Sequence, residues 1–114
     1  MSDCLFCKIG AKEIPAQAVY EDDKLLAVKD INPAAPVHIL IIPKEHIPSL
    51  NDVTEEQAEL VGHVQLVAAK LARQLGIADD GYRLVNNCGK LGGQDILHIH
   101  YHLLGGRQLG WPPG

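Results

Sequence analysis

The strongest constraint on the fold is the segment Leu97 to Leu104, in which histidines alternate with apolar residues. Successive side chains of a β-strand point to opposite faces, so the alternation predicts a strand with one imidazole face and one apolar face. The first face is expected to carry His98, His100 and His102, and the second Leu97, Ile99, Tyr101 and Leu103. At about 3.3 Å per residue, the outer histidines lie about 13 Å apart, too far for all three rings to bind one metal ion at about 2 Å. At least one histidine must therefore serve another purpose.

The remaining strands are predicted from apolar runs and turn residues. Asp22-Asp23 is a good turn between two short strands, and Pro43 ends a nearly continuous apolar run typical of a strand buried on both faces. With the histidine strand, the sheet is expected to comprise Ala18–Glu21, Leu25–Lys29, Val37–Ile42, Tyr82–Asn87 and Leu97–Leu104.

Two helices are expected beside the sheet. A long one runs from about Glu55 to Leu75, because Thr54 and Gln57 form a capping box and Gly76 is placed to end it. A short one is expected over residues 4–10. Together these elements predict an α+β fold, an about five-stranded, mainly antiparallel sheet with one long and one short helix. We expect one domain over residues 1–114, with a C-terminal tail from about residue 105.

Charge and length limit the classes of function. The formal net charge of −4 argues against binding to nucleic acid polymers or anionic membranes. The chain lacks a membrane-length apolar run and a signal-peptide pattern, so we expect a cytoplasmic protein. A chain of 114 residues buries a modest fraction of its surface alone. The wide apolar stripe of the long helix therefore fits either a broad core contact or a second subunit.

Two further groups of residues carry chemistry. The pair Cys4-x-x-Cys7 in a reducing compartment indicates half of a metal site or a redox motif rather than a structural disulfide. His38 lies near the start of the buried strand and reaches the alternating histidines if the two strands are neighbours. The alternative interpretation of His38 is a core histidine that is hydrogen-bonded to a backbone carbonyl.

Several short motifs accompany the histidines along nearly the whole chain. They are Glu13-Ile14-Pro15, Asp30-Ile31, Ala35-Pro36-Val37-His38, Ile42-Pro43-Lys44, Gly92-Gly93-Gln94, Leu103-Leu104-Gly105-Gly106-Arg107 and Trp111-Pro112-Pro113-Gly114. In this combination the chain resembles the histidine triad nucleotide-binding family, specifically the Hint branch of purine nucleoside phosphoramidases. The resemblance implies that family's fold and a homodimer.

The resemblance implies hydrolysis of a purine nucleoside 5′-phosphoramidate to the nucleoside monophosphate and an amine. His100 would attack phosphorus and form a covalent nucleotidyl-histidine, since a neutral imidazole is a competent nucleophile near pH 7. His38 and His102 would donate hydrogen bonds to the phosphate, and no cofactor is needed for this chemistry. Asp95 stands where animal members carry a serine, and we hypothesise that it protonates the leaving group. The alternative is a solvated loop carboxylate.

The resemblance also implies the nucleotide contacts. Asp30 would bind the ribose hydroxyls, because a carboxylate accepts two such bonds well. Asn87 matches a sugar or phosphate contact, and Gly93 and Gln94 belong to a glycine-rich turn whose backbone N–H groups suit phosphate. The apolar walls around a purine would come from Ile31 and Leu40, which could equally be ordinary core residues.

Finally, the resemblance to bacterial members implies a structural zinc site. Its ligands would be Cys4, Cys7, His46 and His98, two thiolates and two imidazoles in a closed tetrahedron. The alternative is a pair of buried free thiols with His46 on the surface. Three other functions stay open: a dinucleoside polyphosphate hydrolase as in the Fhit branch, a nucleotide-binding regulatory module with little turnover, and a hydrolase using zinc-bound water.

Overall fold

The first two strands form a hairpin closed by a single aspartate. β1 (Ala18–Glu21) and β2 (Leu25–Lys29) pair antiparallel, and the carboxylate of Asp22 accepts hydrogen bonds from the N–H groups of Lys24 and Leu25 at 2.8 and 2.7 Å. Such a side-chain bond to the backbone stabilises a tight turn. A computed structural model, which describes residues 4–114, thus confirms the predicted hairpin.

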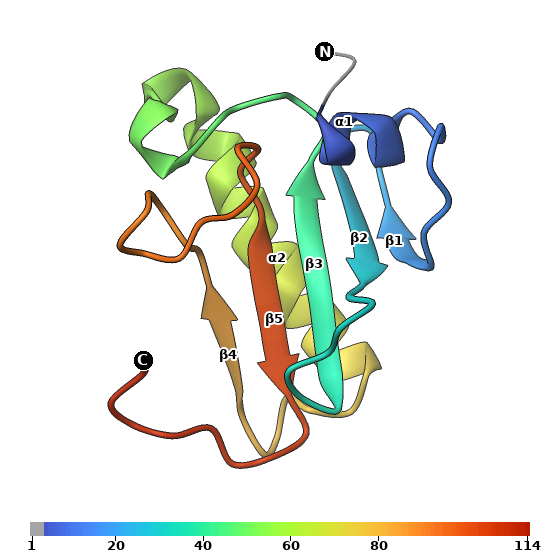
Figure 1. Ribbon diagram of the computed structural model, residues 1–114. Coiled ribbons are helices and arrows are strands. Elements are labelled where there is room, and N and C mark those ends of the chain that lie inside the picture. Colours follow the sequence, from blue (N-terminus) through green and yellow to red (C-terminus); the bar gives the residue numbers. More distant parts are fainter. Residues whose placement is uncertain (1–3) are drawn as a thin grey trace.

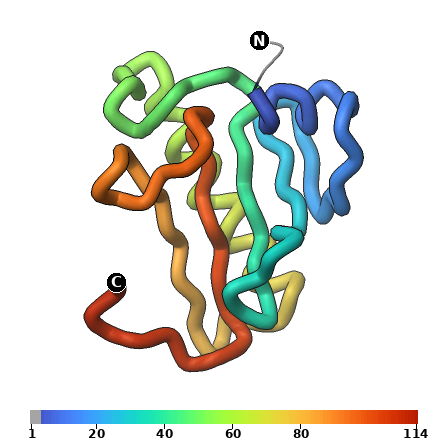
Figure 2. The backbone as a smooth tube through the Cα atoms, in the orientation of Figure 1, coloured from blue at the N-terminus to red at the C-terminus, as the bar shows by residue number. Residues whose placement is uncertain are grey.

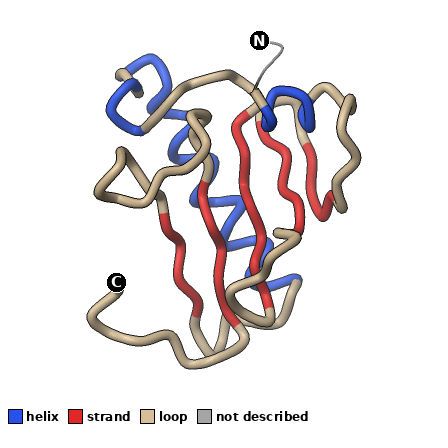
Figure 3. Tube along the Cα trace, in the orientation of Figure 1, coloured by secondary structure: helices blue, strands red, loops and turns tan. Residues whose placement is uncertain are grey.

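Three more strands complete one antiparallel sheet. They are β3 (Val37–Pro43), β4 (Tyr82–Val85) and β5 (Tyr101–Gly105), and the strand order is β1-β2-β3-β5-β4. β5 pairs antiparallel with both β3 and β4. Figure 3 shows the five strands as one sheet with a single long helix behind it. The α+β class, the five strands and the long and short helices are confirmed.

The long helix α2 (Ala58–Gln74) begins after a tightened first turn. Glu55–Gln57 forms a 3-10 turn, and Thr54 caps it through the predicted capping box, with the N–H of Thr54 bound to Oε1 of Gln57 at 2.7 Å. Such 3-10 turns are frequent at helix ends. Gly76, with a φ of 77°, follows the helix as predicted. The expected helix over 55–75 is therefore correct except for the geometry of its first turn.

The two faces of the sheet differ in what covers them. α2 packs against one face and forms the main core, whose members include Ile39, Ile41, Val64, Ala68, Leu71, Ile99, Tyr101 and Leu103. The other face carries a smaller apolar cluster of Phe6, Leu26, Val28 and Ile42. The short helix α1 (Leu5–Gly10) lies near one end of the sheet (Figure 1), and its Phe6 belongs to this second cluster.

The histidine strand is shorter than predicted. β5 begins at Tyr101 rather than Leu97, because the ladder with β3 ends at the pair Ile41 and Tyr101. Beyond it, Pro43 has no N–H to donate, and its carbonyl accepts a bond from the ring of His98 at 2.7 Å. The N–H of Ile99 turns to the carbonyl of Ile47 at 2.7 Å instead.

Two smaller expectations at the same end of the sheet were also wrong. β4 ends at Val85 rather than Asn87, since the side chain of Asn86 binds the carbonyl of His100 at 3.0 Å and replaces a ladder bond. Leu97 was placed with the apolar face but is 69% exposed, because it precedes the extended segment. Figure 2 shows this irregular approach to β5 as a looping tube. No helix within residues 4–114 is long and apolar enough to cross a bilayer.

Candidate active site and metal centre

The sheet register brings His38 to His102. β3 and β5 are neighbours, and His102 lies opposite Leu40, two residues from His38 on the same face of β3. Nε2 of His38 lies 2.9 Å from Nδ1 of His102, and the rings of His100 and His102 have centroids 5.2 Å apart. The side chains keep alternating before Tyr101, where the hydrogen-bond ladder of β5 ends. His38 of β3 therefore shares the face away from α2 with His100 and His102.

The ring of His100 has one proton position fixed by the backbone. Its Nδ1 lies 2.8 Å from the carbonyl oxygen of His98, and a carbonyl can only accept, so Nδ1 carries the hydrogen. Nε2 of the neutral ring therefore keeps its lone pair. This is the tautomer that a nucleophilic imidazole requires. Only 5% of the residue is exposed, so its orientation is well held by packing.

The backbone fixes the proton of His38 in the opposite sense. The N–H of Ala34 donates to Nδ1 of His38 at 3.0 Å, so the hydrogen of the neutral ring is on Nε2. That Nε2–H faces Nδ1 of His102, with Oδ2 of Asp30 as a second acceptor at 3.3 Å. His102 then accepts at Nδ1 and carries its own hydrogen on Nε2. The site thus holds one free lone pair, on His100, beside one N–H donor, on His102.

Burial keeps these donors uncharged. It lowers the pKa of His38, which the nearby carboxylate of Asp30 opposes. It also lowers the pKa of His102, and the rings of His100 and His38 lower it further against the pull of Asp30 and Asp95. Both rings are therefore neutral near pH 7. Each ring therefore donates a hydrogen bond through the Nε2–H of its neutral form and carries no positive charge.

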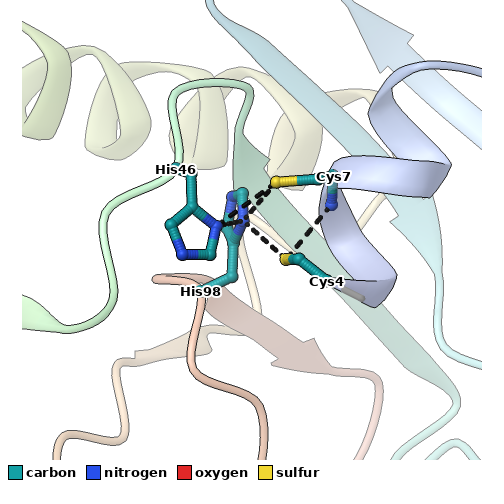
Figure 4. Close-up of side chains that lie close together, drawn as sticks. All are labelled: Cys4, Cys7, His46 and His98. Carbon is teal, nitrogen blue, oxygen red and sulfur yellow. Dashed lines mark hydrogen bonds between the residues drawn. The ribbon is translucent and has the colours of Figure 1, made fainter. Parts of the chain in front are cut away.

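A second cluster gathers four metal-type donors from three segments. Cys4 caps α1 and Cys7 lies within it, His46 comes from the loop after β3, and His98 comes from the segment before β5 (Figure 4). Nδ1 of His98 lies 3.3 Å from Sγ of Cys4 and 3.1 Å from Nδ1 of His46. Sγ of Cys7 lies 3.3 Å from Nδ1 of His46. The bonds of tetrahedral zinc place neighbouring S and N donors about 3.3–3.8 Å apart.

The donor atoms are also in the right chemical form for a cation. Nε2 of His98 donates to the carbonyl of Pro43, which leaves the lone pair of Nδ1 facing the cluster, and burial lowers the pKa of this ring. Burial and the neighbouring Cys4 raise the pKa of the Cys7 thiol. A bound cation would reverse that tendency and hold the sulfur as thiolate. The four residues therefore fit a closed zinc site. They would fill all four coordination positions of the ion, with none left for water.

Asp30, His38 and His102 form another group with metal-ligand side chains. Here the hydrogen bond from Ala34 puts a proton on Nε2 of His38, the atom that faces the group. A protonated nitrogen is no ligand, so this group suits a metal poorly, and the Nε2–H of His102 is the donor that it leaves for a phosphate oxygen.

The glycine-rich turn is held by its own polar side chains. Gln94 accepts from the N–H of Gly89 at 3.0 Å and donates to the carbonyl of Pro48 at 2.7 Å. Asn87 donates to the carbonyl of Gly92 at 2.7 Å, and the N–H of Gly93 binds the carbonyl of Lys90 at 3.1 Å. Nucleotide contacts by these residues stay predictions, and the structure gives them a role in shaping the turn.

The remaining predicted residues differ in how closely they approach the histidines. Asp30 and His38 are in contact, Leu40 is half-buried against the Phe6 cluster, and Asp95 is exposed. Ile31 is 92% exposed, and its contact with a purine stays a prediction.

Sequence reasoning missed Phe6. Its ring meets those of His98 and His100 edge-on, with centroids 5.9 and 4.8 Å apart. The available signal in the sequence was a large apolar residue between Cys4 and Cys7, since a residue flanked by two ligands of a group that includes His98 lies near the histidine segment.

Together the fold and the site define a class of protein. It is an α+β domain in which one long helix covers one face of the sheet. The opposite face carries His100, with an unprotonated Nε2, beside His102, with an Nε2–H donor. Residues 11–109 match the model of the HIT domain. The purine nucleoside phosphoramidase of Escherichia coli (strain K12) is 54% identical over 108 residues, which span 95% of this chain and 91% of that protein. The chain belongs to the HIT domain family.

Solved structures agree with this membership. A HIT family hydrolase from Legionella pneumophila Philadelphia 1 superposes with a TM-score of 0.97 and 54% identity, covering 98% of this chain and 100% of that one. A zinc-bound histidine triad family protein from Mycobacterium smegmatis matches with a TM-score of 0.80 and 34% identity, over 99% of this chain and 81% of that chain.

Proposed function

We propose that this chain hydrolyses purine nucleoside 5′-phosphoramidates to the nucleoside monophosphate and an amine, with His100 as nucleophile. The 54% identity to a purine nucleoside phosphoramidase supports the substrate class. One contact supports the role of His100 above all others: its Nδ1–H is held by the carbonyl of His98 at 2.8 Å. The lone pair of Nε2 is therefore free to bond phosphorus without a prior proton transfer.

In the first step, Nε2 of His100 bonds the α-phosphorus and the phosphorus–nitrogen bond to the amine breaks. The Nδ1–H of His100 remains hydrogen-bonded to the carbonyl of His98. This bond stabilises the positive charge of the substituted ring. The carboxyl group of Asp95 gives a proton to the departing amine. Nε2–H of His102 donates to a non-bridging phosphate oxygen, and His38 fixes that hydrogen on Nε2 by donating to Nδ1 of His102.

In the second step, water attacks the phosphorus and the bond to His100 breaks, which restores its lone pair. The carboxylate of Asp95 accepts the proton that water loses, so the site returns to its starting state. Splitting one displacement into two lowers each barrier.

The nucleotide would lie along the same face. Asp30 binds the ribose hydroxyls, since its oxygens can accept further bonds beyond that from the N–H of Asn32 at 2.8 Å. The turn with Asn87, Gly93 and Gln94 lies next to the sugar and phosphate, and Ile31 and Leu40 contact the purine.

Zinc held by Cys4, Cys7, His46 and His98 has a structural role in this proposal. A closed set of four protein ligands leaves no position for a reactive water. The group ties α1 to the segment that precedes His100. A reducing compartment, the cytoplasm, keeps both thiols available, and we further propose that the protein works as a homodimer.

Turnover of adenosine 5′-phosphoramidate tests the proposal. The wild type is expected to release AMP, and His100→Ala to lose activity about 10³-fold or more. His63→Ala is the matched control, because His63 lies in α2 away from the site, and it is expected to keep the wild-type rate.

Three results would contradict the proposal: preference for a diadenosine polyphosphate, binding without turnover, or activity that disappears reversibly when EDTA removes metal from a protein that stays folded. The first points to a polyphosphate hydrolase, the second to a regulatory module and the third to a metal-water mechanism.

A further inference from the structure

Arg107 binds the loop that sets the tautomer of His38. Its Nε and Nη2 both donate to the carbonyl of Ala34, at 3.3 and 2.9 Å. Its Nη1 donates to the carbonyl of Gln108 at 3.0 Å, which holds the plane of the guanidinium. The N–H of that same Ala34 donates to Nδ1 of His38. The carbonyl and N–H flank one Cα, so the guanidinium and the imidazole grip the same residue from two sides.

The backbone after β5 is shaped to make this contact. Gly106 has a φ of 92°, and a Cβ at that position would lie 2.9 Å from Cβ of Pro36. Only glycine takes that conformation at this distance without strain. The chain therefore turns tightly against the β2–β3 loop, and Arg107 reaches Ala34 directly. Figure 1 shows the segment after β5 beside the β2–β3 loop at the lower end of the sheet.

Within this loop Ala35 is buried, but the residues on either side of it are not. Asn32, Pro33, Ala34 and Pro36 are exposed, and the bond from the N–H of Asn32 to Asp30 acts two residues earlier. The hydrogen bonds from Arg107 to the carbonyl of Ala34 thus determine the direction of the Ala34 N–H.

We propose that Arg107 is a positioning residue for the histidine pair: by holding Ala34, it keeps the proton of His38 on Nε2 and the proton of His102 on its own Nε2. The two rings are linked, because two lone pairs cannot face each other at the 2.9 Å between Nε2 of His38 and Nδ1 of His102. If Ala34 moves away, the 3.3 Å contact with Oδ2 of Asp30 is the remaining restraint on the Nε2–H of His38, and Nδ1 can then take the proton. His102 must then protonate at Nδ1 as well, and its donor toward the phosphate is lost.

This inference rests on the proposed function for its effect on rate but not for its effect on tautomers. The experiment therefore uses two readouts on the full chain. Ring ¹⁵N chemical shifts report directly which nitrogen of each histidine carries the hydrogen. Steady-state hydrolysis of adenosine 5′-phosphoramidate reports the consequence.

In Arg107→Gln, the ¹⁵N shifts of His38 are expected to move toward the Nδ1–H form, with His102 following. kcat should fall about tenfold, less than the about 10²- to 10⁴-fold that loss of an acid–base group costs, while KM changes little. Arg107→Lys keeps a charged donor within reach of the carbonyl and should restore part of both effects. Arg83→Gln is the matched control: Arg83 binds the carbonyl of Gly110 at 2.8 Å, not Ala34, and its loss should leave the His38 shifts and kcat unchanged.

Unchanged His38 and His102 shifts in Arg107→Gln would overturn the inference, even if activity fell, because Arg107 would then act on substrate or on stability alone. If Arg107→Gln did not fold, the same comparison on Arg107→Lys would decide, with wild-type shifts at a reduced kcat counting against the positioning role. A wild type that hydrolyses no phosphoramidate would end the proposed function but leave the tautomer result standing.

Discussion

The carbonyl oxygen of His98 accepts the Nδ1–H of His100 at 2.8 Å, while the ring of His98 offers its own Nδ1 to the two cysteines and His46. His98 thus contacts the cluster of metal-type donors through its side chain and the ring of His100, the proposed nucleophile, through its backbone. The relationship explains why three alternating histidines need not serve a single ion. It also ties the orientation of the His100 ring to the segment that holds the Cys4, Cys7, His46 and His98 group.

The first prediction concerns the metal. Protein purified without chelator is expected to carry one equivalent of zinc, and Cys4→Ser to lose it together with at least about 3 kcal/mol of unfolding free energy. Cys88→Ser, which changes a cysteine outside the cluster, should affect neither. Elemental analysis and urea unfolding measure both quantities. Full stability of a zinc-free Cys4→Ser protein would remove the structural role of the site.

The second prediction concerns the turn of the first hairpin. Burial alone would raise the pKa of Asp22, but hydrogen bonds from Tyr20, from His63 and from two backbone N–H groups lower it far below its ordinary value. A depressed pKa stabilises the fold above the unfolded value of about 3.9, and this contribution is lost as the pH falls below it. Asp22→Asn should therefore cost about 1–2 kcal/mol at pH 7.

The cost of Asp22→Asn should shrink as the pH falls from 7 to 3, because the carboxylate of the unfolded wild-type chain takes up a proton near pH 3.9 while the folded state, with its lowered pKa, stays ionised. Urea unfolding at the two pH values measures it, with the exposed neighbour Asp23→Asn as control. A difference between wild type and Asp22→Asn that grows toward pH 3 would show that the sign is wrong.

The third prediction concerns Gly92 in the turn before the histidines. A Cβ at Gly92 would lie 2.4 Å from the carbonyl oxygen of Cys88, which is backbone and cannot simply rotate away. Gly92→Ala should distort the turn, cost about 1–3 kcal/mol and raise KM. Gly62→Ala, with nothing within 4 Å in the exposed face of α2, should instead gain up to about 1 kcal/mol. Equal behaviour of the two alanine variants would contradict the clash.

The fourth prediction separates two roles for Asp95. If it protonates the leaving amine, Asp95→Asn should slow substrates with poorly leaving alkylamines far more than those with acidic anilines, which depart without a proton. Asp95→Ser tests whether a hydroxyl replaces the carboxyl. A loss of kcat that is the same for good and poor leaving groups would reject the acid role.

Much of the fold was predictable because local patterns decide it. Asp22 fixes the first hairpin, Thr54 and Gln57 fix the start of the long helix, and Gly76 fixes its end, each through contacts within a few residues. The alternation of histidines with apolar residues also predicted correctly which rings share a face.

The missed features depend on contacts distant in sequence. Alternation reports where side chains point, not whether the backbone has a partner, so it could not show that Pro43 ends the ladder next to His98. The contact of Phe6 with His100 depends on how α1 docks, and the grip of Arg107 on Ala34 depends on two loops meeting. Neither pairing leaves a periodic signal in the sequence.

A covalent intermediate on His100 is the central claim. Rapid mixing with adenosine 5′-phosphoramidate, acid quenching and intact-protein mass spectrometry should reveal a transient increase equal to one AMP, and peptide mapping should place it on His100. His100→Ala should show no adduct. Two results would contradict the claim. The first is turnover at the full wild-type rate with no adduct at any time point, including times shorter than one turnover. The second is an adduct on another residue.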